Sequence, residues 1–206
     1  MPQQQSVILL HGLNDTASIF KGLRSQLVDW GYDVHAIDLT PCNAQAGLEP
    51  LAEQVAHYVN AQVPKGPLTV IGFSMGGIVG RYYLQRLDSQ QRVNHLITIA
   101  SPHHGSWAAY LHPGQGCEQM RPGSEFLTTL NQELPLRKTT QLTSIWSHFD
   151  LMILPATNSI IETATNLQIP VLLHPWMVND ARCIEAIGQA LSQNTDKTLI
   201  GRAELS

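Results

Sequence analysis

The sequence predicts an α/β fold in which helices cover both faces of a mostly parallel sheet. Short apolar runs of strand length alternate along the chain with longer segments whose apolar residues recur at helical spacing. Strands separated by helical segments pair in parallel and are buried on both sides. The 206 residues are enough for one sizeable core, and no repeat or linker interrupts them. We therefore expect residues 1–206 to form a single domain.

The first half of the chain contains four predicted strands and three predicted helices. Turn signals separate them, among them Gly31 and the sequence Lys65-Gly66-Pro67. Apolar residues recur on one side of each helical segment, as in a helix that packs against a sheet. The predicted strands are Ser6–Leu10, 33–38, Leu68–Phe73 and 93–100, and the predicted helices cover 19–30, 48–63 and 78–87.

The second half begins with a segment rich in His, Pro and Gly, residues 101–123, which we expect to be irregular surface structure near the functional site. A short helix is predicted over 124–133, strands over 142–149 and 168–173, and a closing helix capped by Asn179 or Asp180. Only residues 103–138 leave enough chain between the predicted elements for an inserted lid. We therefore expect a minimal form of the fold with little or no lid, the loop 112–123 serving as a flap at most.

Composition and charge exclude several classes of protein. Apolar residues make up 43% of the chain and charged residues 14%, which is typical of a globular protein and not of a disordered one. The formal net charge is −4, and Lys and Arg are scattered singly, so no nucleic-acid partner is expected. The start lacks a basic segment and a long apolar run, which predicts no signal peptide, no transmembrane segment and a cytoplasmic location. A leader removed earlier would leave the same start, so this alternative stays open.

The three cysteines indicate no disulfide framework and no metal site. Cys42, Cys117 and Cys183 are widely spaced and form no CxxC pair. Free, buried and inert thiols are the preferred interpretation, and one bridge among the three is the alternative.

The sequence Gly72-Phe73-Ser74-Met75-Gly76-Gly77 matches the GxSxG pattern of a nucleophilic serine. It lies between an apolar strand and a helical segment, where the pattern requires a sharp turn that exposes the serine at its apex. Small residues at 72 and 76 permit the crowded backbone of such a turn. A tightly packed Gly-rich turn without chemistry is the alternative. Nucleotide binding is disfavoured, because no GK[ST] follows and Met75 occupies the first glycine position of a GxGxxG alignment.

Two backbone amides are candidates for an oxyanion hole. His11-Gly12-Leu13 directly follows the first predicted strand, where hydrolases with this turn place one oxyanion donor, and the residue after the nucleophile supplies the other. We therefore assign this role to the N–H groups of Leu13 and Met75. His11 itself is interpreted as structural.

Serine needs a base and an orienting acid, which follow it in the chain order Ser, Asp or Glu, His. Asp150 and His174 each come directly after a predicted strand, so both are expected at the same sheet edge as Ser74. Asp180 is the rival acid, but it follows His174 and suits a helix cap. His95, His103 and His148 are less suitable in position. A metal at the adjacent pair His103-His104 is disfavoured, since neighbouring side chains seldom meet on one face.

These residues resemble the small bacterial triacylglycerol lipases and esterases of the α/β-hydrolase fold. The resemblance covers most of the chain, in the order VILLHGL, VIGFSMGG, ITIASPHHGS, TSIWSHFDLMILP and NLQIPVLLH before a closing helix. It implies Ser74 as nucleophile, Asp150 as acid, His174 as base, and Leu13 and Met75 as oxyanion donors. Phe73 stands where the family often has His, and Pro175 and Trp176 follow the base where smaller or aliphatic residues are usual, which implies a differently shaped acyl site.

We therefore expect a serine hydrolase that cleaves carboxylic esters, with lipid acyl esters preferred, through an acyl-serine intermediate. No metal or organic cofactor is expected. The expected partners are a small-molecule or lipid ester and, transiently, a lipid surface, while the oligomeric state stays open. The alternatives are an acyltransferase or thioesterase with the same triad, and a non-catalytic hydrolase fold that serves as a binding module.

Overall fold

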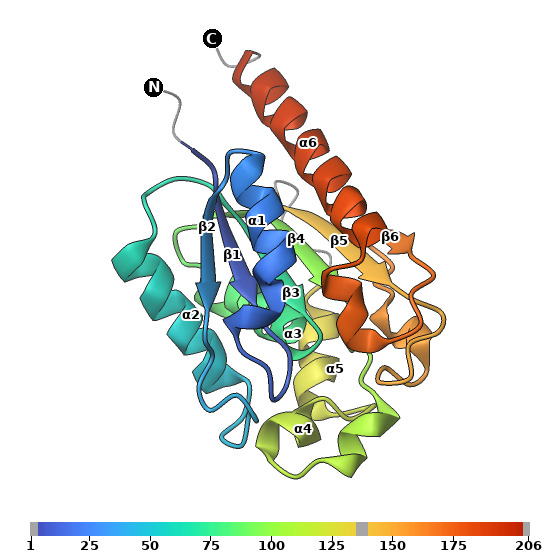
Figure 1. The fold of residues 1–206 in the computed structure, drawn as a ribbon. Helices are drawn as coiled ribbons and strands as arrows, with labels where there is room; N and C mark the ends of the chain where they lie inside the picture. Colours follow the sequence, from blue (N-terminus) through green and yellow to red (C-terminus); the bar gives the residue numbers. More distant parts are fainter. Residues whose placement is uncertain (1–3, 135–139, 204–206) are drawn as a thin grey trace.

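The computed structural model describes residues 4–134 and 140–203, with side chains described as far as Ser192. Across these residues a parallel sheet runs through the molecule in the order β2-β1-β3-β4-β5-β6 (Figure 1). Neighbouring strands are not always consecutive in sequence, as expected when helices cross from one strand to the next. The strands are β1 Ser6–Leu10, β2 Asp33–Ile37, β3 Leu68–Phe73, β4 Val93–Ile99, β5 Gln141–Trp146 and β6 Thr165–Gln168.

Helices cover both faces of the sheet (Figure 1). The α-helices are α1 Lys21–Asp29, α2 Glu49–Gln62, α3 Met75–Tyr82, α4 Gln115–Gln119, α5 Glu125–Gln132 and α6 Ala181–Ala203. A π-helical turn, η2 Tyr83–Leu87, extends α3, and the short 3-10 helices are η1 Ala17–Phe20, η3 Trp107–Leu111, η4 Ala156–Ser159 and η5 His174–Val178. Within the described residues, no helix has the length and apolar character needed to span a membrane.

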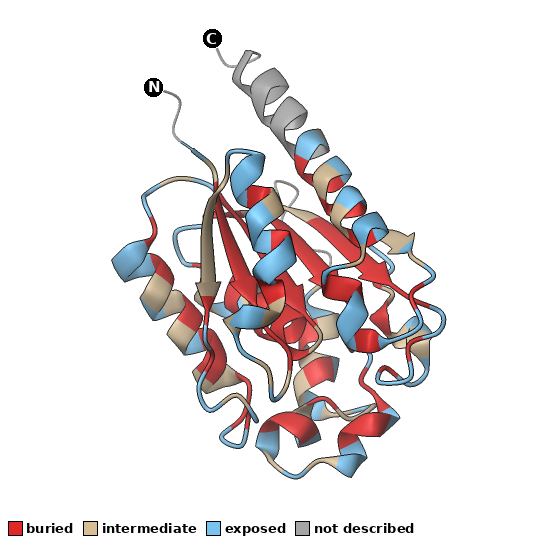
Figure 2. Cartoon of the chain, in the orientation of Figure 1, coloured by how far each residue is buried: buried red, intermediate tan, exposed pale blue. Residues whose placement is uncertain are grey.

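The core consists of two layers, one on each side of the sheet. Alternate residues of β1 point to opposite faces, so Ile8 packs with α2 and α3, whereas Val7 packs with α1 and α6. The central strands are buried on both faces, and the edge strands β2 and β6 are less so (Figure 2). Each fully buried Val, Leu or Ile side chain contributes about 1.5–3 kcal/mol, so these two layers are the main stabilising feature of the fold.

The predicted α/β class and the strands of the first half are confirmed, with bounds that differ by one residue at most. The helix predicted over 124–133 is also confirmed. Ser124 caps it, because its Oγ accepts a hydrogen bond from the Leu127 N–H at 3.2 Å. Asp180 caps α6 in the same way, accepting the Arg182 N–H at 2.9 Å.

The strand predicted over 168–173 is wrong. The last strand is β6, which ends at Gln168, and the apolar residues after it form a loop. Pro170 has no N–H to donate to a sheet ladder, which stops the strand, and Leu172 and Leu173 are exposed. Strand β6 is mostly polar, so its sequence lacks the alternating apolar residues that predict a strand.

The segment 101–123 is more regular than expected, since it contains η3 and α4. Ser106 caps η3 by accepting the Ala108 N–H at 3.1 Å, and α4 follows Gly114, whose φ is 112°. Ala109, Cys117 and Met120 anchor the segment in the core. The apolar residues of η3 and α4 are few and lie among many Gly, Pro and His residues, so the sequence shows no clear helical pattern there. Lys138, the expected end of a possible insertion, lies outside the described residues.

The three cysteines are free thiols, as predicted. Cys117 and Cys183 are buried, whereas Cys42 is only half-buried, which differs from the expectation. Burial, with a contribution from Asp180, raises the pKa of the Cys183 thiol to about 12, so this thiol stays protonated and unreactive at neutral pH.

Candidate active site

The turn from β3 to α3 places Ser74 at its apex. Ser74 has φ 53° and ψ −121°, a strained conformation for a residue with a side chain, and its N–H donates to the Ile99 carbonyl at 2.8 Å. A Cβ at Gly76 would lie 2.0 Å from the Leu10 carbonyl oxygen, and a Cβ at Gly72 would lie 2.4 Å from the Gly76 carbonyl oxygen. Glycine at both positions therefore lets the helix start directly behind the serine.

Asp150 and His174 are brought together by the loops after β5 and β6. The Nδ1–H of His174 donates to Asp150 Oδ2 at 2.7 Å, and both side chains are buried. The other carboxylate oxygen, Oδ1, accepts the N–H groups of Met152 at 2.8 Å and Ile153 at 3.1 Å. With the proton on Nδ1, the Nε2 of His174 carries a lone pair that can accept a proton.

The imidazole lies beside the serine turn. The ring of Phe73, the residue before Ser74, packs against the His174 ring with centroids 4.8 Å apart and planes at 39°. Within the described residues, Ser74 Oγ makes no hydrogen bond. Asp150 is therefore hydrogen-bonded to His174, and the His174 ring packs against Phe73, the residue before Ser74. Catalytic hydrogen bonds to a nucleophile often tighten only when substrate binds.

Leu13, in the loop after β1, lines the same small cavity as Ser74. His11 holds this loop, because its Nδ1–H donates to the Gly12 carbonyl at 2.8 Å and its Nε2 accepts the Leu39 N–H at 2.9 Å. Both ring nitrogens are thus used by the backbone, which agrees with a structural role for His11. Met75 is the first residue of α3, where N–H groups lack partners within the helix and the helix dipole favours negative charge.

A small cavity of about 60 Å³ opens at Ser74. Its walls are largely apolar and come from the loop after β1, from the 102–120 segment and from the loop after Asp150. The lining residues are Leu13, Ser74, Pro102, Ser106, Ala108, Ala109, His112, Cys117, Met120, Met152 and Ile153. Such a cavity suits a short or flexible apolar group, and η3 and α4 form one of its walls.

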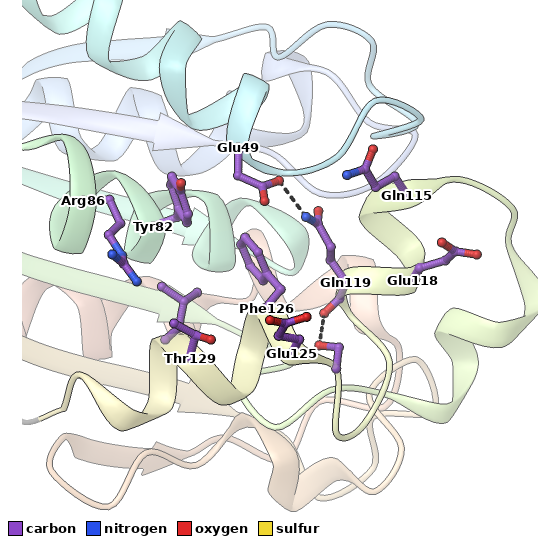
Figure 3. A pocket seen from close by; sticks show the side chains of 11 residues that line it. Glu49, Tyr82, Arg86, Gln115, Glu118, Gln119, Glu125, Phe126 and Thr129 are labelled. Carbon is purple, nitrogen blue, oxygen red and sulfur yellow. Dashed lines mark hydrogen bonds between the residues drawn. The ribbon is translucent and has the colours of Figure 1, made fainter.

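A larger cavity, about 620 Å³, lies between α2, α3 with η2, α4 and α5 (Figure 3). The stacked rings of Tyr82 and Phe126 form part of its wall. Several of its polar groups already have partners: the Gln119 amide donates to Glu49 at 2.6 Å, and Arg86 pairs with Glu133. None of the five predicted site residues lines it, so its volume does not make it the candidate active site.

The other candidates from the sequence lie in structural positions. Asp180 pairs with Arg182 at 2.8 Å, and this hydrogen bond holds the Asp180 pKa below its usual value. His95 bonds Thr143 inside the sheet at 2.9 Å, and His103 bonds Thr98 at 3.0 Å. Burial and the nearby Arg81 hold the pKa of His103 well below its usual value, which favours the neutral ring. Among the described residues, no group of three or more His, Cys, Asp or Glu is arranged to hold a metal.

Sequence reasoning missed the role of one residue at this site. In the sequence Phe73 stands out only as a departure from the pattern of the related family, yet its ring packs on the His174 imidazole. Its position directly before Ser74 was the available signal.

The family model described as "Palmitoyl protein thioesterase" matches residues 6–120, more than half of the chain. The esterase/lipase 3 of Mycoplasma pneumoniae is 36% identical over an alignment of 107 residues, which covers 48% of this chain and 37% of that protein. The chain thus covers little more than a third of the length of this curated relative.

Solved structures share the architecture. The mature lipase BlEst2 of Bacillus licheniformis has a TM-score of 0.73 with 19% identity and 93% coverage of both chains. A lipase-esterase related protein of Clostridium acetobutylicum has a TM-score of 0.65 with 15% identity, covering 90% of this chain and 93% of that one. At such low identity the likeness concerns the fold alone, which is that of the α/β-hydrolases.

The hydrogen bond between Asp150 and His174 leads to a prediction about the acid. Asp150→Asn should lower kcat/KM for an ester by at least about a hundredfold, because an amide does not hold the imidazole with its proton on Nδ1. Asp180→Asn should lower it by about twofold or less, since Asp180 pairs with Arg182. Steady-state kinetics of the two purified variants, with circular dichroism to verify folding, provide the test. A larger loss in Asp180→Asn would move the acid to Asp180.

Proposed function

This chain belongs to the palmitoyl protein thioesterase family, and from that premise we propose that it hydrolyses carboxylic esters with apolar acyl groups through an acyl intermediate on Ser74. The family, the relative and the fold make the chain a hydrolase of the esterase, lipase and thioesterase kind. The observation that carries the finer proposal is the buried Asp150–His174 pair packed beside the strained Ser74 turn. The substrate class and the residue roles are the proposal.

In the proposed reaction, Ser74 Oγ attacks the acyl carbonyl carbon while its proton passes to His174 Nε2. The carbonyl oxygen becomes negative and is held by the N–H groups of Leu13 and Met75. The C–O bond to the leaving alcohol then breaks, and the alcohol takes the proton from His174. A water molecule repeats the sequence on the acyl-serine, releasing the acid and restoring Ser74. Asp150 keeps the proton on Nδ1 and stabilises the imidazolium formed in both steps.

Exposed apolar side chains around the site support a lipid acyl substrate. Of the large apolar side chains exposed in the described residues, all but Val28 and Trp30 lie in three segments that also carry residues of the site. We call this set the apolar rim. It consists of Trp107, Tyr110, Leu111, Phe149, Leu151, Met152, Leu154, Leu172, Leu173 and Trp176.

An apolar rim of this kind is suited to contact with a lipid surface. Exposed apolar patches mark binding sites, and the rings of Trp and Tyr suit the boundary between water and lipid. The rim carries no cluster of Lys or Arg, and the chain has a formal net charge of −4, which favours an uncharged surface over an anionic one. A transient contact with neutral lipid is therefore part of the proposal.

Hydrolysis of acyl thioesters is the second candidate function, and the match to the thioesterase family favours it. The same serine, base and oxyanion donors would act on a thioester, since only the leaving group differs. Comparing kcat/KM for an oxygen ester and a thioester with the same acyl chain distinguishes the two. Adding an alcohol acceptor to the same assay detects acyl transfer through the ester product.

Ser74→Ala tests the proposed function most simply. We expect it to remove at least about 99.9% of the turnover of a chromogenic acyl ester, because the nucleophile is lost. Ser89→Ala is the control. Ser89 is exposed and precedes the amino end of β4, whereas Ser74 follows the carboxyl end of β3, so this variant should retain full activity. Ester turnover that survives in a folded Ser74→Ala variant would refute an acyl intermediate on Ser74.

The apolar rim can be tested separately from the chemistry. Replacing Trp107 and Trp176 together by Ser should weaken binding to phosphatidylcholine vesicles by roughly tenfold or more, since two large exposed apolar side chains are lost. Hydrolysis of a soluble short-chain ester should change by about twofold or less.

Val28→Ser, which alters an exposed apolar residue of α1 outside the rim, is the matched control and should bind vesicles as the unaltered chain does. Cosedimentation with vesicles measures the binding. Equal binding by the double variant and the unaltered chain would contradict a role of the rim in lipid contact.

A further inference from the structure

The hydroxyl of Ser106 joins two walls of the small cavity at Ser74. Ser106 is only 3% exposed and is itself one of the lining residues. Its O–H donates to the Met152 carbonyl oxygen at 2.7 Å. The same Oγ accepts the N–H groups of Leu154 at 2.9 Å and of Ala108 at 3.1 Å. A serine hydroxyl offers one donor and two acceptor positions, so this one is fully used.

These hydrogen bonds connect segments that are far apart in sequence. Ala108 belongs to η3, whereas Met152 and Leu154 lie in the loop after β5. The backbone also joins the two segments directly, because the Trp107 N–H donates to the Leu154 carbonyl at 3.0 Å. Since Ala108 and Met152 both line the cavity, the Ser106 hydroxyl fixes the separation of two of its walls.

Met152 links Ser106 to the candidate acid. The Met152 N–H donates to Asp150 Oδ1 at 2.8 Å, while its carbonyl oxygen accepts from Ser106. Ile153, the next residue, donates to the same carboxylate oxygen at 3.1 Å. The other oxygen, Oδ2, accepts the His174 Nδ1–H at 2.7 Å. A displacement of Met152 would therefore move a donor that holds the carboxylate in place against the base.

Capping of η3 explains only part of this arrangement. A cap requires the hydrogen bond from the Ala108 N–H alone. The bonds to Met152 and Leu154 leave η3 and reach the loop that carries the acid. Removing the hydroxyl would take the partner from one carbonyl oxygen and two N–H groups at once, which favours separation of the two segments.

We propose that Ser106 is a positioning residue that fixes the width of the acyl cavity and, through Met152, the place of the Asp150 carboxylate. This role rests on the proposed function for its catalytic meaning and extends it to the selectivity for acyl length. The cavity of about 60 Å³ encloses only the part of an acyl chain next to the carbonyl. The walls that Ser106 joins restrict its size, so loss of the hydroxyl should favour longer acyl groups.

Ser106→Ala tests the selectivity. The ratio of kcat/KM for a hexanoyl ester to kcat/KM for the acetyl ester of the same alcohol should rise by at least about threefold, because further methylenes can enter the widened cavity. The kcat for the acetyl ester should fall by about tenfold, since the acid is less well placed. Partial unfolding alone would lower the turnover of both esters alike and leave the ratio unchanged.

Two further variants separate position from chemistry. Ser144→Ala removes another buried hydroxyl, which donates to the Ser159 carbonyl at 2.6 Å and is not among the groups that line the cavity, so the ratio should stay unchanged. Ser106→Thr keeps the hydroxyl and should restore the ratio of the unaltered chain. Ser106→Cys, whose thiol is a weak donor and a weak acceptor, replaces Ser106→Ala if circular dichroism shows that the alanine variant does not fold.

Amide hydrogen exchange, followed by NMR in the full chain without substrate, tests the link to Asp150. The Met152 N–H should exchange at least about tenfold faster in Ser106→Ala, because the loop that holds it opens more often. Ser106 accepts no hydrogen bond from this N–H, so the change would be transmitted through the Met152 peptide. In Ser144→Ala the exchange of the Met152 N–H should not change.

An unchanged exchange rate at Met152, or an unchanged ester ratio, in a folded Ser106→Ala variant would overturn the positioning role. The exchange measurement needs no turnover, so its outcome is separate from that of the proposed function. If the unaltered chain hydrolyses no ester, the proposed function is refuted, while faster exchange at Met152 would still establish the link from Ser106 to the Asp150 loop.

Discussion

The close approach of α3 to β1 is the constraint on which the rest of the site depends. Gly76 lies so near the Leu10 and His11 carbonyl oxygens that a Cβ there would be 2.0 Å from one and 2.6 Å from the other. This contact forces the chain to reverse within a few residues after β3 and holds Ser74 at a positive φ. It also sets the loop after β1 next to the start of α3, so Leu13 and Ser74 line one cavity. The strain at Ser74 is sustained by a sheet buried on both sides.

The parallel sheet explains why residues far apart in sequence meet. Leu13, Ser74, Asp150 and His174 all come after the carboxyl ends of strands, which lie at one edge of the sheet. The 2.7 Å hydrogen bond between Asp150 and His174 joins the loops of two neighbouring strands there. Phe73 adds a packing contact between the serine turn and the imidazole. In the proposed reaction, the fold therefore supplies orientation and charge, and a water molecule supplies the second nucleophile.

The sequence predicted what depends on strong periodic signals and on short motifs. The buried strands β1, β3 and β4 were predicted because they are short apolar runs, and the turn at Ser74 was predicted because its glycines occupy fixed positions. The strand β6 was misplaced because it is polar and lies at an edge, while the apolar run after it is broken by Pro170. The contact of Phe73 with the His174 ring was missed for a different reason. It joins residues that are far apart in sequence, and no local pattern encodes such a contact.

The structure of the protein after reaction with a serine-directed phosphonate tests the central claim most directly. The account predicts a covalent bond between phosphorus and Ser74 Oγ, with one phosphoryl oxygen within about 3 Å of the N–H groups of Leu13 and Met75. His174 should lie within hydrogen-bonding distance of the adduct and still donate to Asp150. An adduct on another residue, or an oxygen that points away from both amides, would contradict the assignment of the nucleophile and its oxyanion hole.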